Sequence, residues 1–202
     1  MERYDFMLVG VGGQGTLLAS DVLAGAGLRA GFDVKKSEVH GMAQRGGSVT
    51  SHVRWGPEVH SPLVACGQAD VILAFEKLEA ARYAHYLRPG GHLVVNDHAI
   101  PPVAASTGRA VYPSDAQIVA SLLAATPNVH LVPGMVLAQR AGAARTVNMV
   151  LIGVLSRFVA LDLEHWLSAL QERVPPRSVE VNRSAFVLGR EATLSPLPVS
   201  GT

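Results

Sequence analysis

The sequence predicts an α/β protein, with a Rossmann-like, mostly parallel sheet, helices on both faces and a helical C-terminal part. Two observations carry this prediction. Short apolar runs alternate with helix-like stretches up to residue 132, and a glycine-rich turn joins the first run to the first helix. From residue 141 onward the pattern is helical. Ligands on such sheets gather at the carboxyl ends of the strands, so we expect a site at that edge.

The first elements read as one βαβ unit. Asp5 to Val11 is a short apolar run that ends in glycines, as buried strands do. Thr16 to Ala30 has the apolar spacing of a helix, and the Thr16 hydroxyl suits its cap. Phe32 to Ser37 is the second strand, and Val49 to Trp55 is a further strand-like run.

The middle of the chain continues the alternation. Strands are predicted at Ala69 to Phe75, His92 to Asn96, Arg109 to Tyr112 and Val129 to Val132. A turn is predicted at Arg88 to Gly91. Helices are predicted at Glu76 to Leu87, with Lys77, Glu79 and Arg82 on the wet face, and from Ser114 or Asp115 to Ala125.

The last part is predicted to be helical and to complete a single domain over residues 1–190. Its helices are Ala141 to Leu161, Leu163 to Val174 and Ser178 to Gly189, with a break at Pro175 and Pro176. Residues 191–202 are rich in Ser and Pro and read as a flexible tail.

Composition narrows the function classes. Charged residues make up only 16% of the 202 residues, below the usual share of about 25%, which favours a surface buried against another chain. A well-covered sheet is the alternative explanation. The net charge of +1 gives no support for nucleic-acid binding. No targeting segment or membrane span is visible, so we expect a cytoplasmic protein without a membrane partner.

The cysteine count limits redox chemistry. Cys66 is the only cysteine, which excludes an internal disulfide and an iron–sulfur cluster held by this chain alone. We expect it to be a small buried side chain. No histidine pattern matches a metal site, so no metal ligand is predicted.

A glycine loop is the first candidate binding motif. Gly10, Gly12 and Gly15 fit G-x-G-x-x-G between a strand and a helix, with Gly13 and Gln14 inside the motif. Such glycines let backbone N–H groups approach a phosphate at a helix N-terminus. Tight packing of strand on helix without a ligand is the alternative.

The end of the second strand departs from the usual dinucleotide pattern. An acidic residue is expected there to hold ribose hydroxyls, but the sequence reads Lys35, Lys36 and Ser37. Two lysines suit a phosphate better than a ribose diol, which disfavours NAD and leaves NADP or another phosphorylated adenosine. A methyltransferase that uses S-adenosylmethionine lacks its expected acid here as well.

The second motif is SEVHGMAQRGGSVTSHVRWG, from Ser37 to Gly56. Together with GVGGQG, it resembles the gamma-type domain of 2-oxoacid:ferredoxin oxidoreductases. His40, Met42 and Gln44 point to the indolepyruvate branch of that family, since pyruvate relatives tend to read S-Y-G-P-E-M-R-G-G here. The resemblance continues in TVNMVLIG, residues 146–153, and in NRSAFVLG, residues 182–189, and so spans most of the chain.

The resemblance implies a subunit of a larger enzyme. That enzyme oxidatively decarboxylates an aryl 2-oxoacid such as indolepyruvate, passes the acyl group to coenzyme A and reduces ferredoxin. A large alpha subunit is expected to hold thiamine diphosphate, Mg and 4Fe-4S clusters. The present sequence lacks both the several thiolates that a cluster needs and the G-D-G…N motif of thiamine enzymes.

The motif residues suggest supporting roles at the partner's active site. Arg45 offers a permanently charged fork for a carboxylate or phosphate, His40 titrates near neutrality, and Gln44 can orient either group. Gly46 and Gly47 let the backbone pass close to a ligand or to another chain. The alternative is a network between subunits that does not touch substrate.

Two further expectations complete the candidate site. The diphosphate of coenzyme A is expected at Gly12 to Gly15, with Lys35 or Lys36 on its adenosine phosphate. Asn148 stands in an apolar helix and needs partners, so it is expected to bond to the glycine loop or to the second motif, unless it only begins a helix. A stand-alone NADP- or S-adenosylmethionine-binding enzyme and a non-catalytic scaffold are the competing functions.

Overall fold

The computed structural model describes residues 2–40 and 47–194. Its centre is a six-stranded sheet with the order β2-β3-β1-β4-β5-β6. The strands are β1 (Tyr4–Val11), β2 (Asp33–His40), β3 (Ser48–Gly56), β4 (Ala69–Ala74), β5 (Leu87–Asn96) and β6 (Val129–Val132). Strands β1, β4, β5 and β6 pair in parallel, whereas β3 is antiparallel to both of its neighbours. The predicted mostly parallel sheet is confirmed.

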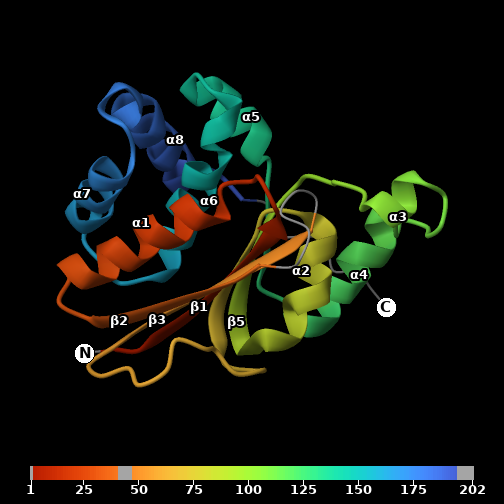
Figure 1. The fold of residues 1–202 in the computed structure, drawn as a ribbon, viewed down its shortest axis with the longest axis horizontal. Helices are drawn as coiled ribbons and strands as arrows, with labels where there is room; N and C mark the ends of the chain where they lie inside the picture. Colours follow the sequence, from red (N-terminus) through yellow and green to blue (C-terminus); the bar gives the residue numbers. More distant parts are fainter. Residues whose placement is uncertain (1, 41–46, 195–202) are drawn as a thin grey trace.

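Helices cover both faces of this sheet, as predicted (Figure 1). Helices α1, α5, α6, α7 and α8 lie on one face, and α2 and α4 lie on the other. The α-helices are α1 (Thr16–Arg29), α2 (Lys77–Tyr83), α3 (Val103–Ser106), α4 (Asp115–Ala125), α5 (Gly134–Ala141), α6 (Val147–Leu155), α7 (Leu163–Arg173) and α8 (Val179–Glu191). Short 3-10 turns are η1 (Ala84–Tyr86), η2 (Ala144–Thr146), η3 (Ser156–Phe158) and η4 (Pro176–Ser178).

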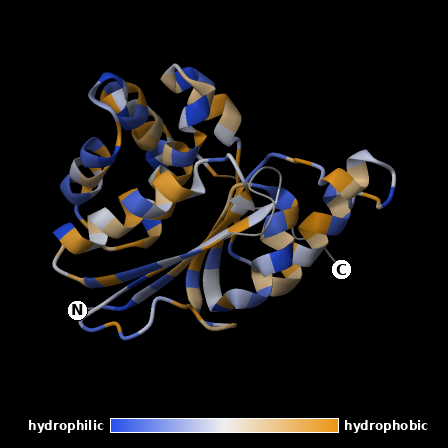
Figure 2. Cartoon of the chain, in the orientation of Figure 1, coloured by the Kyte–Doolittle hydropathy of each residue, from blue (hydrophilic) through white to orange (hydrophobic). Residues whose placement is uncertain are grey.

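The two helical layers produce two hydrophobic cores, one on each face. Successive side chains of a strand point to opposite faces, so Phe6 and Leu8 enter the core under α1 and α6, while Met7 and Val9 enter the core under α2 and α4. Hydrophobic and hydrophilic residues alternate around α7 and α8, because each presents one face to this core and the other to solvent (Figure 2).

The βαβ unit predicted at the start differs in one respect. Strands β1 and β2 run in the same direction, but they are not neighbours, because β3 lies between them. A connection of only seven residues joins β2 to β3 and makes them an antiparallel pair, and β3 takes the edge of β1 that a simple βαβ unit would give to β2. Strand β2 also continues past the predicted end at Ser37 to His40.

The C-terminal part is helical, but its predicted division was partly wrong. A single helix was expected from Ala141 to Leu161, whereas α5 ends at Ala141 and α6 begins at Val147. Gly142 has a φ of 112°, a left-handed conformation that ends α5. Helices α6 and α8 cross closely: a Cβ on Gly153 would meet the Phe186 carbonyl oxygen, and one on Gly189 would meet that of Val150.

Other boundaries follow local chemistry. The predicted helix from Ser114 is confirmed as α4, which begins with a capping box between Ser114 and Gln117. The strand predicted at Arg109 to Tyr112 is wrong, because that segment is a loop after the short helix α3. The turn predicted at Arg88 to Gly91 falls inside β5, whose pairing with β4 is irregular at that end.

Three predictions of exposure were wrong. Lys77 and Glu79 are 8% and 5% exposed rather than on a wet face. Lys77 binds Asp97 and Asp115, and Glu79 accepts a hydrogen bond from Ser48, so each buried charge has partners. Cys66 is exposed rather than buried. Among the helices that the structure describes, none combines the length and apolarity that a membrane span requires.

Candidate functional site

The glycine loop joins β1 to α1 at the carboxyl edge of the sheet. Gly13 and Gly15 have φ values of 100° and 80°, in the left-handed region that glycine tolerates best. A Cβ on Gly15 would lie 2.8 Å from the Asn148 amide nitrogen, whereas a Cβ on Gly13 would meet no atom within 4 Å. Gly15 is therefore fixed by packing as well as by conformation, and Gly13 borders open space.

Gln14 folds back beneath the loop and holds it to the sheet. Its Oε1 accepts a hydrogen bond from the Val11 N–H (2.7 Å), and its Nε2 donates to the Phe75 carbonyl oxygen (2.9 Å). A Cβ on Gly10 would lie 2.9 Å from this Oε1, which explains the glycine there. The Gln14 amide therefore acts inside the protein, and the backbone of the loop remains to meet a ligand.

The second motif meets the glycine loop at the same edge. The Gly12 N–H donates to the Gly47 carbonyl oxygen over 2.9 Å. Next along the chain, the Ser48 hydroxyl donates to Glu79 (2.5 Å) and lies 3.1 Å from the Tyr83 hydroxyl. Strand β3 is thus anchored to both the loop and α2 where it begins.

Several predicted residues of this motif lie outside the described part of the chain. Gln44, Arg45 and Gly46 are outside the described residues, as is the side chain of His40. The His40 backbone ends β2 and pairs with Val49 of β3. The described flanks of residues 41–46 therefore lie at the carboxyl edge, next to the glycine loop.

Asn148 makes the contact that the sequence predicted. It is 4% exposed, its amide nitrogen lies 3.4 Å from the Gly15 carbonyl oxygen, and its Oδ1 accepts from the Met149 N–H (3.0 Å). Asn148 also stands in the first turn of α6, so both interpretations of this residue hold. It connects the C-terminal helices to the glycine loop.

Lys35, Lys36 and Ser37 lie away from the loop. Lys36 is level with Phe6 in the strand register, whereas His40 is level with Gly10. The four residues between these levels correspond to about 13 Å along the strand. The predicted strand ended at Ser37, whereas β2 continues to His40. The prediction therefore placed the lysines too close to the loop.

Both lysines also have partners within the chain. Lys35 binds Asp33 (2.5 Å), and Lys36 binds Asp21 (2.5 Å) and Glu38 (2.6 Å). Burial disfavours the charged form of Lys36, but the hydrogen bonds to the two carboxylates outweigh it and raise its pKa above the ordinary value. The positive charge of β2 is therefore largely compensated.

Sequence reasoning missed a buried carboxylate, Glu76, which follows Phe75, a residue that the glycine loop contacts. Glu76 is 1% exposed, caps α2 by accepting from the Glu79 N–H (2.9 Å), and accepts from the Ile100 N–H (3.1 Å) and the Tyr112 hydroxyl (2.5 Å). Burial, together with the bond to Glu76, raises the pKa of Tyr112. The only signal in the sequence was an acidic residue directly after an apolar strand, the position of a helix cap.

The match to known proteins extends over nearly the whole chain. Residues 5–192 match the family described as pyruvate ferredoxin/flavodoxin oxidoreductase. The chain belongs to this family.

Relatives in the pyruvate ferredoxin/flavodoxin oxidoreductase family agree in length as well as in sequence. The indolepyruvate oxidoreductase subunit IorB of Pyrococcus horikoshii is 44% identical over 95% of this chain and 96% of its own. The corresponding subunit of Thermococcus kodakarensis is 42% identical with the same coverage. The crystal structure of a keto/oxoacid ferredoxin oxidoreductase gamma subunit from Geobacter sulfurreducens PCA is 25% identical, covers 95% of this chain and 96% of its own, and has a TM-score of 0.72. The predicted gamma-type fold is therefore confirmed.

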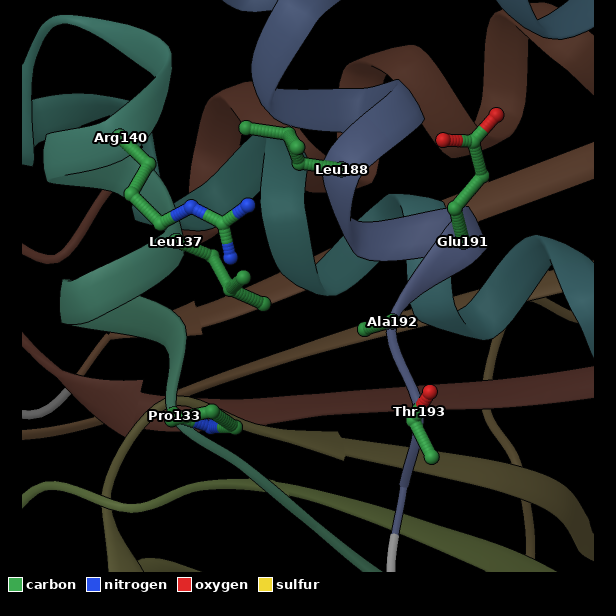
Figure 3. Close-up of a pocket in the computed structure, with 7 residues that line it drawn as sticks. All are labelled: Pro133, Leu137, Arg140, Leu188, Glu191, Ala192 and Thr193. Carbon is green, nitrogen blue, oxygen red and sulfur yellow. The ribbon is translucent and has the colours of Figure 1, made fainter.

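Two of the cavities formed by the described residues lie against the C-terminal helices and are lined in part by the predicted blocks 146–153 and 182–189. One, of about 430 Å³, lies between α5 and the end of α8, with Arg140 directed into it and Glu191 on the opposite wall (Figure 3). It contains none of the predicted site residues, and its two charged side chains have opposite signs. The other cavity, of about 230 Å³, includes Asn148 and adjoins the glycine loop. Among the described residues, no group of three or more His, Cys, Asp or Glu side chains is placed to hold a metal.

Proposed function

We propose that this chain is the small subunit of a cytoplasmic 2-oxoacid:ferredoxin oxidoreductase that acts on an aryl 2-oxoacid such as indolepyruvate. In the reaction the 2-oxoacid loses CO2, its acyl group is transferred to the thiol of coenzyme A, and two electrons pass to ferredoxin. The observation that carries the proposal is the junction of two motifs at one sheet edge, where the Gly12 N–H meets the Gly47 carbonyl oxygen at 2.9 Å. The IorB relatives, similar over almost their whole length, support the choice of substrate class.

The redox and thiamine chemistry belongs to the partner in this proposal. An iron–sulfur cluster needs several thiolates, and the chain has one cysteine, the exposed Cys66. The residues present therefore do not fit a cluster, and the sequence lacks the G-D-G…N motif for thiamine diphosphate and Mg. We assign these groups to a large alpha subunit and derive no step through them here.

This chain contributes positioning at the partner's active site. We assign Arg45 to an anionic group of substrate or coenzyme A, His40 to a hydrogen bond or proton transfer, and Gln44 to their orientation. The described anchors at Gly47 and Ser48 place the flank of this segment beside the glycine loop. A network between subunits without substrate contact is the alternative role for the same residues.

The glycine loop is the proposed contact for coenzyme A. Helix α1 begins at Thr16 after the N-cap residue Gly15, with no side-chain cap and no acidic residue in its first turn, so its N–H groups are available to an anion. Gly13 borders open space, which lets a diphosphate approach the backbone. No observation favours a stand-alone NADP or S-adenosylmethionine enzyme. The lysines that could bind the extra phosphate of NADP are paired with carboxylates, and Glu38, the acidic residue near the end of β2, is paired with Lys36.

Substitution of Arg45 tests the proposed role. The chain is produced together with its large partner, and indolepyruvate-dependent reduction of a viologen dye is measured for the wild type, Arg45→Ala and Arg45→Lys. We expect Arg45→Ala to raise the KM for indolepyruvate or coenzyme A at least about tenfold without loss of assembly, because a charge-assisted hydrogen bond disappears. Unchanged kinetics with weaker assembly would instead support the network between subunits.

A further inference from the structure

A pocket with a mixed polar and apolar lining adjoins the glycine loop on the side of the C-terminal helices. It has a volume of about 230 Å³ and lies where α1, the start of α6 and the connection between α7 and α8 meet. Leu18, Asn148 and Asn182 line it, together with Arg145 and Arg177. Asn148 also contacts the Gly15 carbonyl oxygen, so one side chain belongs to both the pocket and the loop.

The two arginines form no ion pair with any carboxylate of the described residues. Arg145 lies in η2 and Arg177 in η4. The arginines near the sheet behave differently, since Arg54 binds Asp5 and Arg88 binds Asp70. Within residues 2–40 and 47–194, the pocket is thus lined by two positive charges that no carboxylate pairs with.

Helix ends add to this positive potential. Leu18 and Asn148 belong to the first turns of α1 and α6, and both helices begin without a side-chain cap and without a first-turn acidic residue. Helix N-termini carry partial positive charge from their unpaired N–H groups. On the other face of the sheet, Glu76 caps α2 and Ser114 caps α4, whereas the helices on the face of the pocket, α5, α7 and α8 included, all begin without a side-chain cap.

The remaining walls combine apolar side chains, Val174 and Pro175, with polar ones, among them Asn182. Asn182 is 7% exposed and donates to the Ser178 carbonyl oxygen over 2.8 Å, which holds its amide at the pocket. Glu180, in the first turn of α8, is exposed and does not line the pocket. The site therefore combines donors, positive charge and limited volume, which is the chemistry that recognises a phosphate group.

We propose that this pocket is a phosphate subsite in which Arg145 and Arg177 bind a phosphate group of coenzyme A. The assignment to coenzyme A rests on the proposed function, whereas the preference for a phosphate rests on the pocket alone. Contact through Asn148 places the subsite next to Gly15, so one cosubstrate can reach both. Lys35 and Lys36, the alternative cations, are paired and lie away from the loop.

The test uses the assembled enzyme of both subunits and isothermal titration calorimetry. Coenzyme A and inorganic pyrophosphate are titrated into the wild type, the Arg145→Ala/Arg177→Ala variant and the Arg145→Lys/Arg177→Lys variant. Arg140→Ala is the matched control, because Arg140 is an exposed arginine of the same helical layer that lines the other cavity, opposite Glu191. Gel filtration establishes that each variant assembles.

We expect the double alanine variant to bind coenzyme A about 100-fold more weakly, or about tenfold for each charge-assisted hydrogen bond that the substitutions remove. The lysine variant should recover part of this affinity because it keeps the charges without the guanidinium fork. Arg140→Ala should change the affinity less than about twofold, as expected for a surface residue outside the subsite.

Other results overturn one part of the proposal or all of it. Unchanged affinity for both ligands in an assembled double alanine variant would overturn the phosphate subsite. Weaker binding of pyrophosphate with unchanged binding of coenzyme A would overturn the assignment to coenzyme A and indicate a site for free phosphate. If the complex shows no activity with indolepyruvate but the variant still binds pyrophosphate more weakly, the proposed function fails while the subsite stands.

Discussion

At the scale of single residues, two amides determine the shape of the candidate site. Gln14 links the glycine loop to β4 through the Phe75 carbonyl oxygen, and Asn148 links the same loop to α6. Both side chains reach the carboxyl edge of the sheet from elements that are distant in sequence. The loop is therefore held in place before any ligand is present, as an anion site of backbone N–H groups requires.

Replacement of Gln14 tests this support. Gln14→Ala removes one hydrogen bond to the Val11 N–H and one to the Phe75 carbonyl oxygen, and leaves both groups partly buried. We expect the free energy of unfolding to fall by about 1–3 kcal/mol. Urea denaturation followed by circular dichroism measures it, with the exposed Gln171→Ala as the control. An equal effect of both substitutions would show that the amide does not hold the loop.

His130 makes stability depend on pH. Its ring lies 3.2 Å from His92 and packs against Phe158. Burial, with the nearby His92 and Arg157, lowers the pKa of His130 from 6.5 to about 4. Between these values the unfolded chain binds a proton that the folded chain does not, so the free energy of unfolding falls as the pH drops from about 6.5 to 4 and is fully retained above that window.

The measurement is urea denaturation at pH 7, 6 and 5. His130→Gln should lose less stability over this range than the wild type, because the glutamine does not titrate. His60→Gln, at an exposed position, should follow the wild type. A wild-type curve that is flat over this pH range would contradict the explanation.

At the scale of elements, the sequence predicted strands better than helix boundaries. The run of residues 71–75 is continuously apolar and short, which favours a buried strand, and β4 covers most of it. The run from Ala141 to Leu161 was predicted as one helix, whereas α6 covers only Val147–Leu155, with a 3-10 turn on each side. Lys77 and Glu79 looked like a wet helix face, because their partners Asp115 and Ser48 are far away in sequence.

The candidate site was predictable to a similar degree. Glycine spacing located the loop, and an amide in an apolar helix located Asn148. The pairing of Lys36 with Asp21 and the pocket of Arg145 and Arg177 depend on tertiary contacts that no local pattern records.

The crossing of α6 and α8 gives a test at this scale. Gly153→Ala would place a methyl group against the Phe186 carbonyl oxygen of the neighbouring helix, and backbone cannot move aside easily. We expect a loss of about 2–3 kcal/mol of unfolding free energy, larger than the gain in helix propensity. Gly25→Ala in α1 is the matched control, since its Cβ would lie 3.2 Å from a single methyl carbon of Ala169. Equal stabilities of the two variants would exclude a backbone clash at the crossing.

At the scale of the whole molecule, the proposed function makes this chain one half of a site shared with a partner. Its two motifs and the phosphate subsite converge on one edge of the sheet, where Leu17 and Val39 also expose 42% and 51% of their surface. Apolar side chains next to unoccupied donors suit an edge that another subunit covers. The low charged content predicted such a contact, and the IorB relatives support it.

The affinity of the assembled enzyme for coenzyme A shows whether the lysines of β2, rather than the arginines of the pocket, bind its phosphate. Lys35→Ala/Lys36→Ala should change this affinity by less than about twofold, because both ammonium groups are bound to carboxylates and are not needed as phosphate ligands. A tenfold or greater decrease would return the lysines to the binding site and place the adenosine phosphate along β2.

The central claim is that this chain completes an active site whose cofactors belong to a partner. The most direct measurement is indolepyruvate- and coenzyme A-dependent reduction of a viologen dye by three preparations: the isolated chain, the proposed large subunit, and the two produced together. We expect activity only from the complex. Activity of the isolated chain, or full activity of the large subunit without it, would contradict the account.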